Sequence, residues 1–415
     1  MSVGRVTRAA LVERSNGNWF MYMNDHSGAA AHAAAVATLL APRFAVGAQR
    51  SPRRQESRRR PESSTVRYAR HEPGLTALLY EADVLEGLEP FAEDEIYDVL
   101  GVADVAGSPG ALVFRYGGAP DSLLDLRSVV AVFRVLHFDV PRPKTLLGHQ
   151  HFEAIVAAIA DAQSLWPRHA FRTLRLSAAG SESAVLQRLR DELAARTGLE
   201  PAEEGDMLLR LRRARLGWQV LVRLSPRPLA TRPWRVANLP GALNATVAHA
   251  MMRLTRPQPA DRVLNIACGS ATLLIERLAL GPARLTIGCD VDEHALASAR
   301  ANLQASGYDR AVQLEQWDAT QLPLSERSMD VICADLPFGQ MVGSHHNNET
   351  LYPQLFAEAT RVATVQARMV LISHEIRLLE WVAEQWGAQW QLRDMLRVRV
   401  GGMTPRVYLF HRVQE

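Results

Sequence analysis

From about residue 260 onward, short apolar runs alternate with longer segments whose apolar positions recur at helical spacing. The runs predict strands at residues 262–266, 284–289, 312–316, 329–334 and 369–373, with helices beginning near Ala271, Asp292, Leu351 and Glu375. Strands that alternate with helices in this way are typical of a parallel, doubly wound α/β sheet. Two last strands, at about 391–400 and 406–411, flank Gly401 and Gly402 and predict a terminal hairpin on the sheet edge.

The pattern between residues 75 and 254 predicts two smaller units. Strands at 77–82, 111–116 and 129–137, with helices at 87–100 and 122–128, indicate a small α+β layer. The second unit, about 151–232, has helices at 151–162 and 181–197, a strand at 171–176 and a hairpin of 207–213 with 218–224 around Gly217. A helix rich in small residues, 240–254, then leads into the C-terminal domain.

The first 70 or so residues show no such periodicity. Residues 51–64 are rich in Arg, Pro and Ser, which is typical of a disordered segment. Two interpretations remain open: an electrostatic arm that contacts RNA phosphates, or a plain solvated tail.

The composition excludes some classes of protein but does not identify a function. The net charge of +3 and hydrophobic fraction of 47% suit a globular protein with sizeable cores. No apolar run approaches the roughly 18 residues of a membrane span, so we expect a cytoplasmic protein without a membrane partner. The spacing of Cys268, Cys289 and Cys333 fits neither a zinc pattern nor a disulfide framework, so we expect no metal site and three buried thiols.

The stretch Asp335-Leu336-Pro337-Phe338 follows the fourth of the predicted C-terminal strands. Ligands of open α/β sheets bind beyond the carboxyl ends of the strands, so Asp335 leaves its strand where chemistry would occur. Pro337 stiffens the backbone and Phe338 offers a flat apolar face. The stretch is either a clamp for a planar nitrogenous ring or a simple strand-to-loop turn.

Three neighbouring strand ends favour the first interpretation. The first strand ends in a turn of small residues around Gly269, where a ligand could approach backbone N–H groups at a helix N-terminus. The second strand ends at Asp290, which is placed to accept hydrogen bonds from ribose hydroxyls, and the third at Asp318, which could face an adenine amine. We expect Asp292 to cap the following helix instead. Acids at successive strand ends after one glycine turn predict a nucleoside-type cofactor site.

This arrangement resembles the class I S-adenosylmethionine-dependent methyltransferases. The resemblance implies that Gly269 neighbours the methionine moiety, Asp290 binds ribose and Asp318 contacts adenine. The full expected cofactor-binding set is Asn265, Ala267, Cys268, Gly269, Ser270, Asp290, Val291, Asp318 and Ala319. The chain departs from the family at Asn265, where an acid is usual, and at Ala271, where Gly is frequent.

The Asp335–Phe338 stretch is similar to the (Asn/Asp)-Pro-Pro-(Tyr/Phe) motif of enzymes that methylate exocyclic amines. With Leu336 and a following Gly339, it looks most like THUMP-domain RNA guanine-N2 methyltransferases. The stretches 85–89, 224–229, 232–235, 240–243 and 401–408 resemble other parts of the same family. Composition indicates a disordered basic extension at 1–72. The resemblance implies an α/β chain with a ferredoxin-like domain at 73–150, a THUMP RNA-binding domain at 151–232 and a methyltransferase domain at 233–415. That last domain would be Rossmann-like, with a mostly parallel sheet and a terminal antiparallel hairpin.

The implied activity is transfer of a methyl group from S-adenosylmethionine to the N2 amine of a guanine in RNA, with tRNA as the expected RNA. By resemblance, Asp335 and the backbone carbonyl near Leu336 or Pro337 accept hydrogen bonds from the amine, and Phe338 stacks on the base. We do not expect Asp335 to be a strong general base, because an ordinary Asp has a pKa near ~3.9.

Arg210, Arg212, Arg232 and Arg235 are the candidate RNA contacts. Alternation along the strands could place some of these arginines on one exposed face, which would be either a phosphate-binding patch or a merely solvated surface. Other functions stay open as well: the same chemistry on ribosomal RNA, methylation of adenine N6, or RNA binding by a protein that has lost catalysis.

Overall fold

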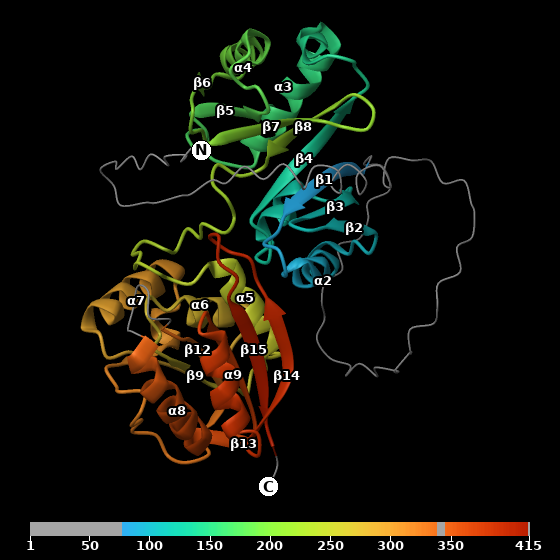
Figure 1. Ribbon diagram of the computed structural model, residues 1–415. Coiled ribbons are helices and arrows are strands. Elements are labelled where there is room, and N and C mark those ends of the chain that lie inside the picture. The colour runs from blue at the N-terminus through green and yellow to red at the C-terminus, as the bar shows by residue number, and fades with distance from the viewer. Residues whose placement is uncertain (1–76, 338–344, 414–415) are drawn as a thin grey trace, which may run out of the picture.

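The structure, a computed structural model, describes residues 77–337 and 345–413. Figure 1 shows two bodies stacked end to end, each built on its own sheet. The predicted basic extension 1–72 lies outside the described residues. No helix in the described ranges is both long and apolar enough to cross a membrane.

The upper body holds an eight-stranded sheet in the order β2-β3-β1-β4-β8-β7-β5-β6. Its strands are β1 Leu78–Asp83, β2 Val105–Ser108, β3 Ala111–Tyr116, β4 Ala131–Phe138, β5 Thr173–Ala178, β6 Glu200–Pro201, β7 Met207–Arg213 and β8 Trp218–Arg223. Its helices are α2 Glu89–Leu100, α3 His149–Ser164 and α4 Ala184–Thr197, with 3-10 turns η1 Pro120–Asp125 and η2 Pro143–Leu147. Strand β4 pairs antiparallel with β8, from Phe133 opposite Arg223 to Phe138 opposite Trp218. The two predicted N-terminal units therefore share one continuous sheet.

The lower body holds a seven-stranded sheet in the order β11-β10-β9-β12-β13-β15-β14. Its strands are β9 Arg262–Ile266, β10 Leu285–Cys289, β11 Gln313–Glu315, β12 Met329–Asp335, β13 Ala363–Ser373, β14 Trp390–Arg397 and β15 Arg406–Arg412. Strands β9 to β13 pair in parallel, and β15 and β14 add the antiparallel hairpin at one edge. From β9 the strand order runs to one side through β10 and β11, and to the other side through β12 and β13. Sheets of this kind bind ligands at the switch, here between β9 and β12.

Helices cover both faces of this second sheet (Figure 1). They are α5 Ala245–Leu254, α6 Thr272–Ala279, α7 Glu293–Ser306, α8 His345–Val362 and α9 Ile376–Gln385, with the 3-10 turn η3 Asp309–Ala311. Apolar side chains of α8 and α9 share a core with one face, whereas α5, α6 and α7 pack against the other. The doubly wound α/β class predicted from the sequence is confirmed for this body.

The structure differs from the local predictions at several places. The helix predicted at 240–254 begins only at Ala245, because Asn244 is extended and its Oδ1 caps the helix by accepting from Thr246 N at 2.9 Å. The helix predicted to begin at Leu351 already begins at His345. The edge strand β2 was not predicted, since its four residues include Gly107 and lack an apolar run.

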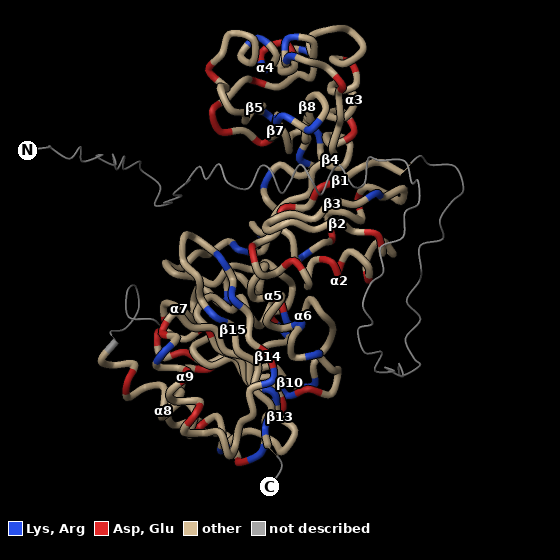
Figure 2. The backbone as a smooth tube through the Cα atoms, turned by 45° about the vertical axis from the view of Figure 1, so that its right-hand side comes forward, with Lys and Arg blue, Asp and Glu red and all other residues tan. Residues whose placement is uncertain are grey.

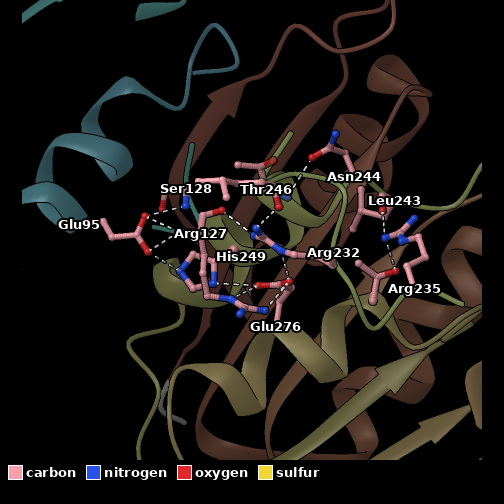
Figure 3. A network of polar contacts seen from close by, with 12 residues as sticks. Glu95, Arg127, Ser128, Arg232, Arg235, Leu243, Asn244, Thr246, His249 and Glu276 are labelled. Atoms are coloured by element: carbon pink, nitrogen blue, oxygen red, sulfur yellow. Dashed lines mark hydrogen bonds and ion pairs between the residues drawn. The ribbon is translucent and has the colours of Figure 1, made fainter. Parts of the chain in front are cut away.

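A buried polar cluster joins the two bodies (Figure 3). Glu276 of α6 is fully buried and accepts two hydrogen bonds from Arg127, each of 2.9 Å. Arg232 Nε donates to Glu276 Oε1 at 2.9 Å, and Arg232 NH2 donates to the Arg127 carbonyl at 2.7 Å. His249 of α5 lies between Glu276 Oε2, at 3.1 Å, and Glu95 Oε1 of α2, at 3.4 Å.

The cluster stays ionised because each carboxylate has several donors. Burial by itself would raise the pKa of Glu276, but the His249 hydrogen bond and the Arg232 and Arg127 charges lower it to about 2. Burial is outweighed in the same way at Glu95, whose pKa is lowered by His249 and by the backbone N–H groups of Ser128 and Arg127. Two buried carboxylates thus hold the upper body, the linker 224–244 between β8 and α5, and helices α5 and α6 in one arrangement.

We predict that Glu276→Ala lowers the free energy of unfolding by about 3–5 kcal/mol, because it leaves Arg127 and Arg232 without their shared carboxylate. Urea denaturation followed by circular dichroism measures the change. Glu192→Ala is the matched control: its carboxylate pairs with Arg188 on an exposed helix face, and its removal should cost less than about 1 kcal/mol. Equal losses in the two variants would contradict the role given to Glu276.

Candidate active site

A cavity of about 620 Å³ opens beyond the carboxyl ends of β9, β10 and β12. That volume lies in the range of small-molecule sites. Its walls come from five segments: linker residues 239–243, the loop after β9, the turn after β10, residues 317–319 and the stretch 335–337 with the first turns of α8. All nine residues of the expected cofactor-binding set line this cavity.

The loop after β9 is tightly wound. Ala267, Gly269 and Ala271 have φ of 48°, 53° and 66°, in the left-handed region that residues other than glycine seldom adopt. The loop is closed by Cys268 N, which donates to the Cys289 carbonyl at 2.8 Å, and by Ala271 N, which donates to the Cys268 carbonyl at 2.9 Å. The frequent glycine at position 271 of the resembled family therefore has a conformational reason, and Ala271 holds the same turn at a cost in backbone strain.

Asp290 ties this loop to the next strand. Its Oδ2 accepts from Gly269 N at 2.9 Å and its Oδ1 accepts from Asp292 N at 3.1 Å. Asp292 caps α7 by accepting from His294 N at 2.9 Å, as predicted. A Cβ at Gly288, just before this turn, would lie 2.6 Å from Leu274 Cδ1, so a larger residue there would require Leu274 to move.

The third acid, Asp318, is held by its own turn. Its Oδ1 accepts from Thr320 N at 2.8 Å and from Thr320 Oγ1 at 2.7 Å, and the backbone hydrogen bond is the main reason that its pKa is lowered. The charged carboxylate therefore faces the cavity ready to accept from an amine or hydroxyl.

Asn265 lies at the floor of the cavity and is buried. Its Nδ2 donates to the carbonyls of Cys333, at 3.0 Å, and Ile266, at 3.2 Å. Its Oδ1 has no hydrogen-bond partner among the described residues, although buried acceptors usually have one. This orphaned oxygen suits a ligand that carries a donor, such as an ammonium group, and partly replaces the acid usual in the resembled family.

Asp335 ends β12 and lies partly exposed in the cavity wall. Burial raises its pKa to about 7, which contradicts the ordinary value assumed from the sequence. Leu336 N donates to the Ile372 carbonyl at 3.0 Å, so the backbone after Asp335 is anchored to β13. Phe338, the expected stacking residue, lies outside the described residues.

The Pro337 carbonyl is engaged within the protein. It accepts from Asn348 Nδ2 at 2.9 Å and from Tyr352 Oη at 2.7 Å. Two donors already engage this oxygen, so of the two carbonyls expected to accept from the target amine, that of Pro337 is the less suited. Asn348 and Tyr352 were missed from the sequence; their spacing of one helical turn is the signal that places them on one face.

The four arginines predicted to contact RNA do not line the cavity. Figure 2 shows basic positions along β7 and β8 of the upper body, yet the predicted arginines hold acids of their own chain. Arg210 pairs with Asp83 and lies over the Phe133 ring, and Arg212 makes two hydrogen bonds to buried Glu81.

The other two arginines lie in the linker. Arg232 is buried on Glu276, and Arg235 NH2 donates to the Leu243 carbonyl at 2.8 Å and to Thr272 Oγ1 at 2.9 Å. Burial contradicts an exposed phosphate contact at Arg232, whose role here is to join the two bodies.

The C-terminal part of the chain is similar in sequence to known methyltransferases. Residues 232–406 match the family described as "RMKL-like, methyltransferase domain". The chain is similar to the tRNA (guanine(6)-N(2))-methyltransferase THUMP3 of Mus musculus, 28% identical over 188 residues, which are 42% of this chain and 37% of that protein. It is similar to the tRNA (guanine(6)-N2)-methyltransferase of Thermus thermophilus, 31% identical over 46% of this chain and 56% of the relative. The chain thus spans about two fifths of the mammalian relatives and just over half of the bacterial one.

Among solved structures, TrmN from Thermus thermophilus has a TM-score of 0.64 to this chain, with 23% identity, and covers 81% of this chain and 100% of its own. This likeness confirms the Rossmann-like methyltransferase fold. The family match over residues 232–406 and the named relatives confirm the resemblance to RNA guanine-N2 methyltransferases for the part of the chain that they cover.

We predict that Asp290→Ala weakens binding of S-adenosylmethionine by about 10-fold to 100-fold, because a charged acceptor and its bond to Gly269 N are both lost. Isothermal titration calorimetry measures the affinity. Glu293→Ala removes a neighbouring charge that pairs with Arg300 outside the cavity wall and should leave the affinity unchanged. An unchanged affinity in Asp290→Ala would argue against this cavity as the cofactor site.

Proposed function

We propose that this chain, whose residues 232–406 form a methyltransferase domain of the RMKL-like family, transfers a methyl group from S-adenosylmethionine to the N2 amine of a guanine in RNA. The observation that carries the proposal is the position of Asp335. Its carboxylate shares one cavity with Gly269, Asp290 and Asp318, at a backbone turn that β13 and α8 hold in place. The names of the relatives, which act on guanine N2 in tRNA, support the same chemistry.

The residues present fit the cofactor. S-adenosylmethionine supplies the methyl group, on a positively charged sulfur, when it is bound. Asp290 and Asp318 offer ionisable acceptors to ribose and adenine, and the orphaned Asn265 Oδ1 offers a neutral acceptor near the loop at Gly269. A Cβ placed at Gly269 would meet no atom within 4 Å, so the protein leaves open space beside this loop.

Asp335 performs two tasks in this proposal. The guanine amine is a poor nucleophile because its lone pair is delocalised into the ring. A carboxylate that accepts from one amine hydrogen orients the nitrogen and stabilises the positive charge that develops as the new bond to carbon forms. With a pKa raised to about 7, Asp335 can then take the released proton at neutral pH, which an ordinary aspartate does poorly.

The upper body would dock the RNA. We propose that residues 73–150 act as the ferredoxin-like domain and residues 151–232 as the THUMP domain. Because the four candidate arginines are engaged within the chain, the exposed Arg213, Arg215 and Arg227 of the same unit are better placed to meet phosphates. The tRNA is the expected RNA and the cytoplasm the expected compartment. A bovine relative is named for U6 snRNA, so the assay below includes that RNA.

We predict that Asp335→Ala lowers N2-methylguanine formation by at least about 100-fold, since the group that accepts from the amine and takes its proton is lost. Mass spectrometry of nucleosides from tRNA and U6 snRNA, incubated with the protein and S-adenosylmethionine, measures the product. Asp330→Ala is the matched control on the same strand, because Asp330 holds Arg262 outside the cavity. Equal N2-methylguanine with Asp335→Ala and the unmodified protein would refute the proposal.

We also predict that kcat/KM for methyl transfer rises with pH up to about 7 and then levels off. The buried carboxyl has a raised pKa, so the reactive ionised form is lost as the pH falls through that value. Initial rates between pH 5.5 and 8.5, with RNA limiting, give the profile. If the residual activity of Asp335→Ala shows the same rise, another group causes it and the assignment to Asp335 fails.

A further inference from the structure

Asn348 stands beside the reacting stretch in an orientation that the structure fixes. It lies on the first turns of α8, is fully buried and lines the cavity together with Asp335 and Leu336. Its Nδ2 donates to the Pro337 carbonyl at 2.9 Å. Because only the amide nitrogen can donate there, the other end of the side chain is a carbonyl oxygen, an acceptor.

A chain of hydrogen bonds holds the Pro337 carbonyl, to which Asn348 donates. Tyr352 uses its only hydroxyl proton on the Pro337 carbonyl, at 2.7 Å. Ser373 must therefore donate to Tyr352 Oη, 2.9 Å away, and Ser373 Oγ in turn accepts from Glu375 N at 2.9 Å. Asn348 and Tyr352 both hold one rigid carbonyl, so the amide of Asn348 cannot turn over without losing its bond.

Asn348 Oδ1 is left without a partner. It is a buried oxygen with no hydrogen bond among the described residues, in a wall that otherwise satisfies its polar groups at Pro337, Tyr352 and Ser373. Native proteins seldom bury such an acceptor unless a ligand completes it. The place where the ligand would arrive is the cavity that Asn348 shares with Asp335.

We infer that Asn348 recognises the target base, its Oδ1 accepting from guanine N1–H while Asp335 accepts from the N2 amine. This inference rests on the proposed function. Guanine presents N1–H and the N2 amine side by side on its Watson–Crick edge, and extruded bases are recognised along that edge. Adenine carries an unprotonated N1 beside its amine, which would face Asn348 Oδ1 with a second acceptor. Asn348 thus selects guanine over adenine, and Tyr352 and Ser373 are positioning residues.

A base analogue tests this assignment. 2-Aminopurine keeps the 2-amine that receives the methyl group but lacks N1–H. A tRNA ligated from synthetic parts carries either guanine or 2-aminopurine at the position that the mass-spectrometric assay identifies. The unmodified protein should methylate guanine faster, and Asn348→Ala should shrink the ratio of the two rates by about 10-fold to 100-fold, the effect of one buried hydrogen bond. A general loss of folding would lower both rates and cancel in the ratio.

Tyr352→Phe is the matched control. It removes the other hydrogen bond to the Pro337 carbonyl but leaves Asn348 Oδ1 in place. It should slow the methylation of both substrates equally and leave the ratio of the two rates unchanged.

An unchanged ratio of rates in Asn348→Ala would overturn the inference. If the same variant also bound S-adenosylmethionine more weakly, Asn348 Oδ1 would be assigned to the cofactor instead. A protein that methylates no guanine in tRNA or U6 snRNA would overturn the proposed function along with the inference, whereas guanine methylation with an unchanged ratio would overturn the inference alone.

Discussion

The buried carboxylate of Glu276 is the constraint on which the rest of this molecule depends. An ionised group in the interior is tolerated only if donors surround it, and here the donors come from separate parts of the chain: Arg127, Arg232 and His249. Glu276 lies on α6, the helix that begins directly after the loop at Gly269. The same ion that joins the two bodies therefore also fixes the helix that borders the cavity, so the upper body and Asp335 are held relative to one another through Glu276.

Much of the cavity could be predicted because a parallel sheet gathers strand ends. Asp290, Asp318 and Asp335 are far apart in the sequence, but each follows a strand of the same sheet, and its geometry brings them to one edge. The alternating pattern of apolar runs was sufficient to place those ends. Local backbone detail was less accessible: the start of α5 depends on the Asn244 cap, which the apolar pattern does not reveal.

The arginines show where sequence reasoning stops. Alternation predicts which side of a strand a residue lies on, but not what stands opposite it. Arg212 meets Glu81, 131 residues away in the chain, and Arg210 meets Asp83, 127 residues away, because β7 and β1 belong to the same sheet. The sequence also did not reveal the desolvation of Asp335. Its pKa of about 7 comes from surroundings that only the fold provides. Asn348 and Tyr352 gain their roles only when α8 packs beside the end of β12.

The pairing of β4 with β8 bears on how such a protein can be inherited and recombined. A genetic exchange near residue 150 would part these two strands and leave two open sheet edges, which are templates for aggregation. The smallest portion of the upper body that could move between proteins with its edges kept paired is the whole eight-stranded sheet. The two units that follow one another along the chain would therefore be exchanged between proteins only together, as a single unit.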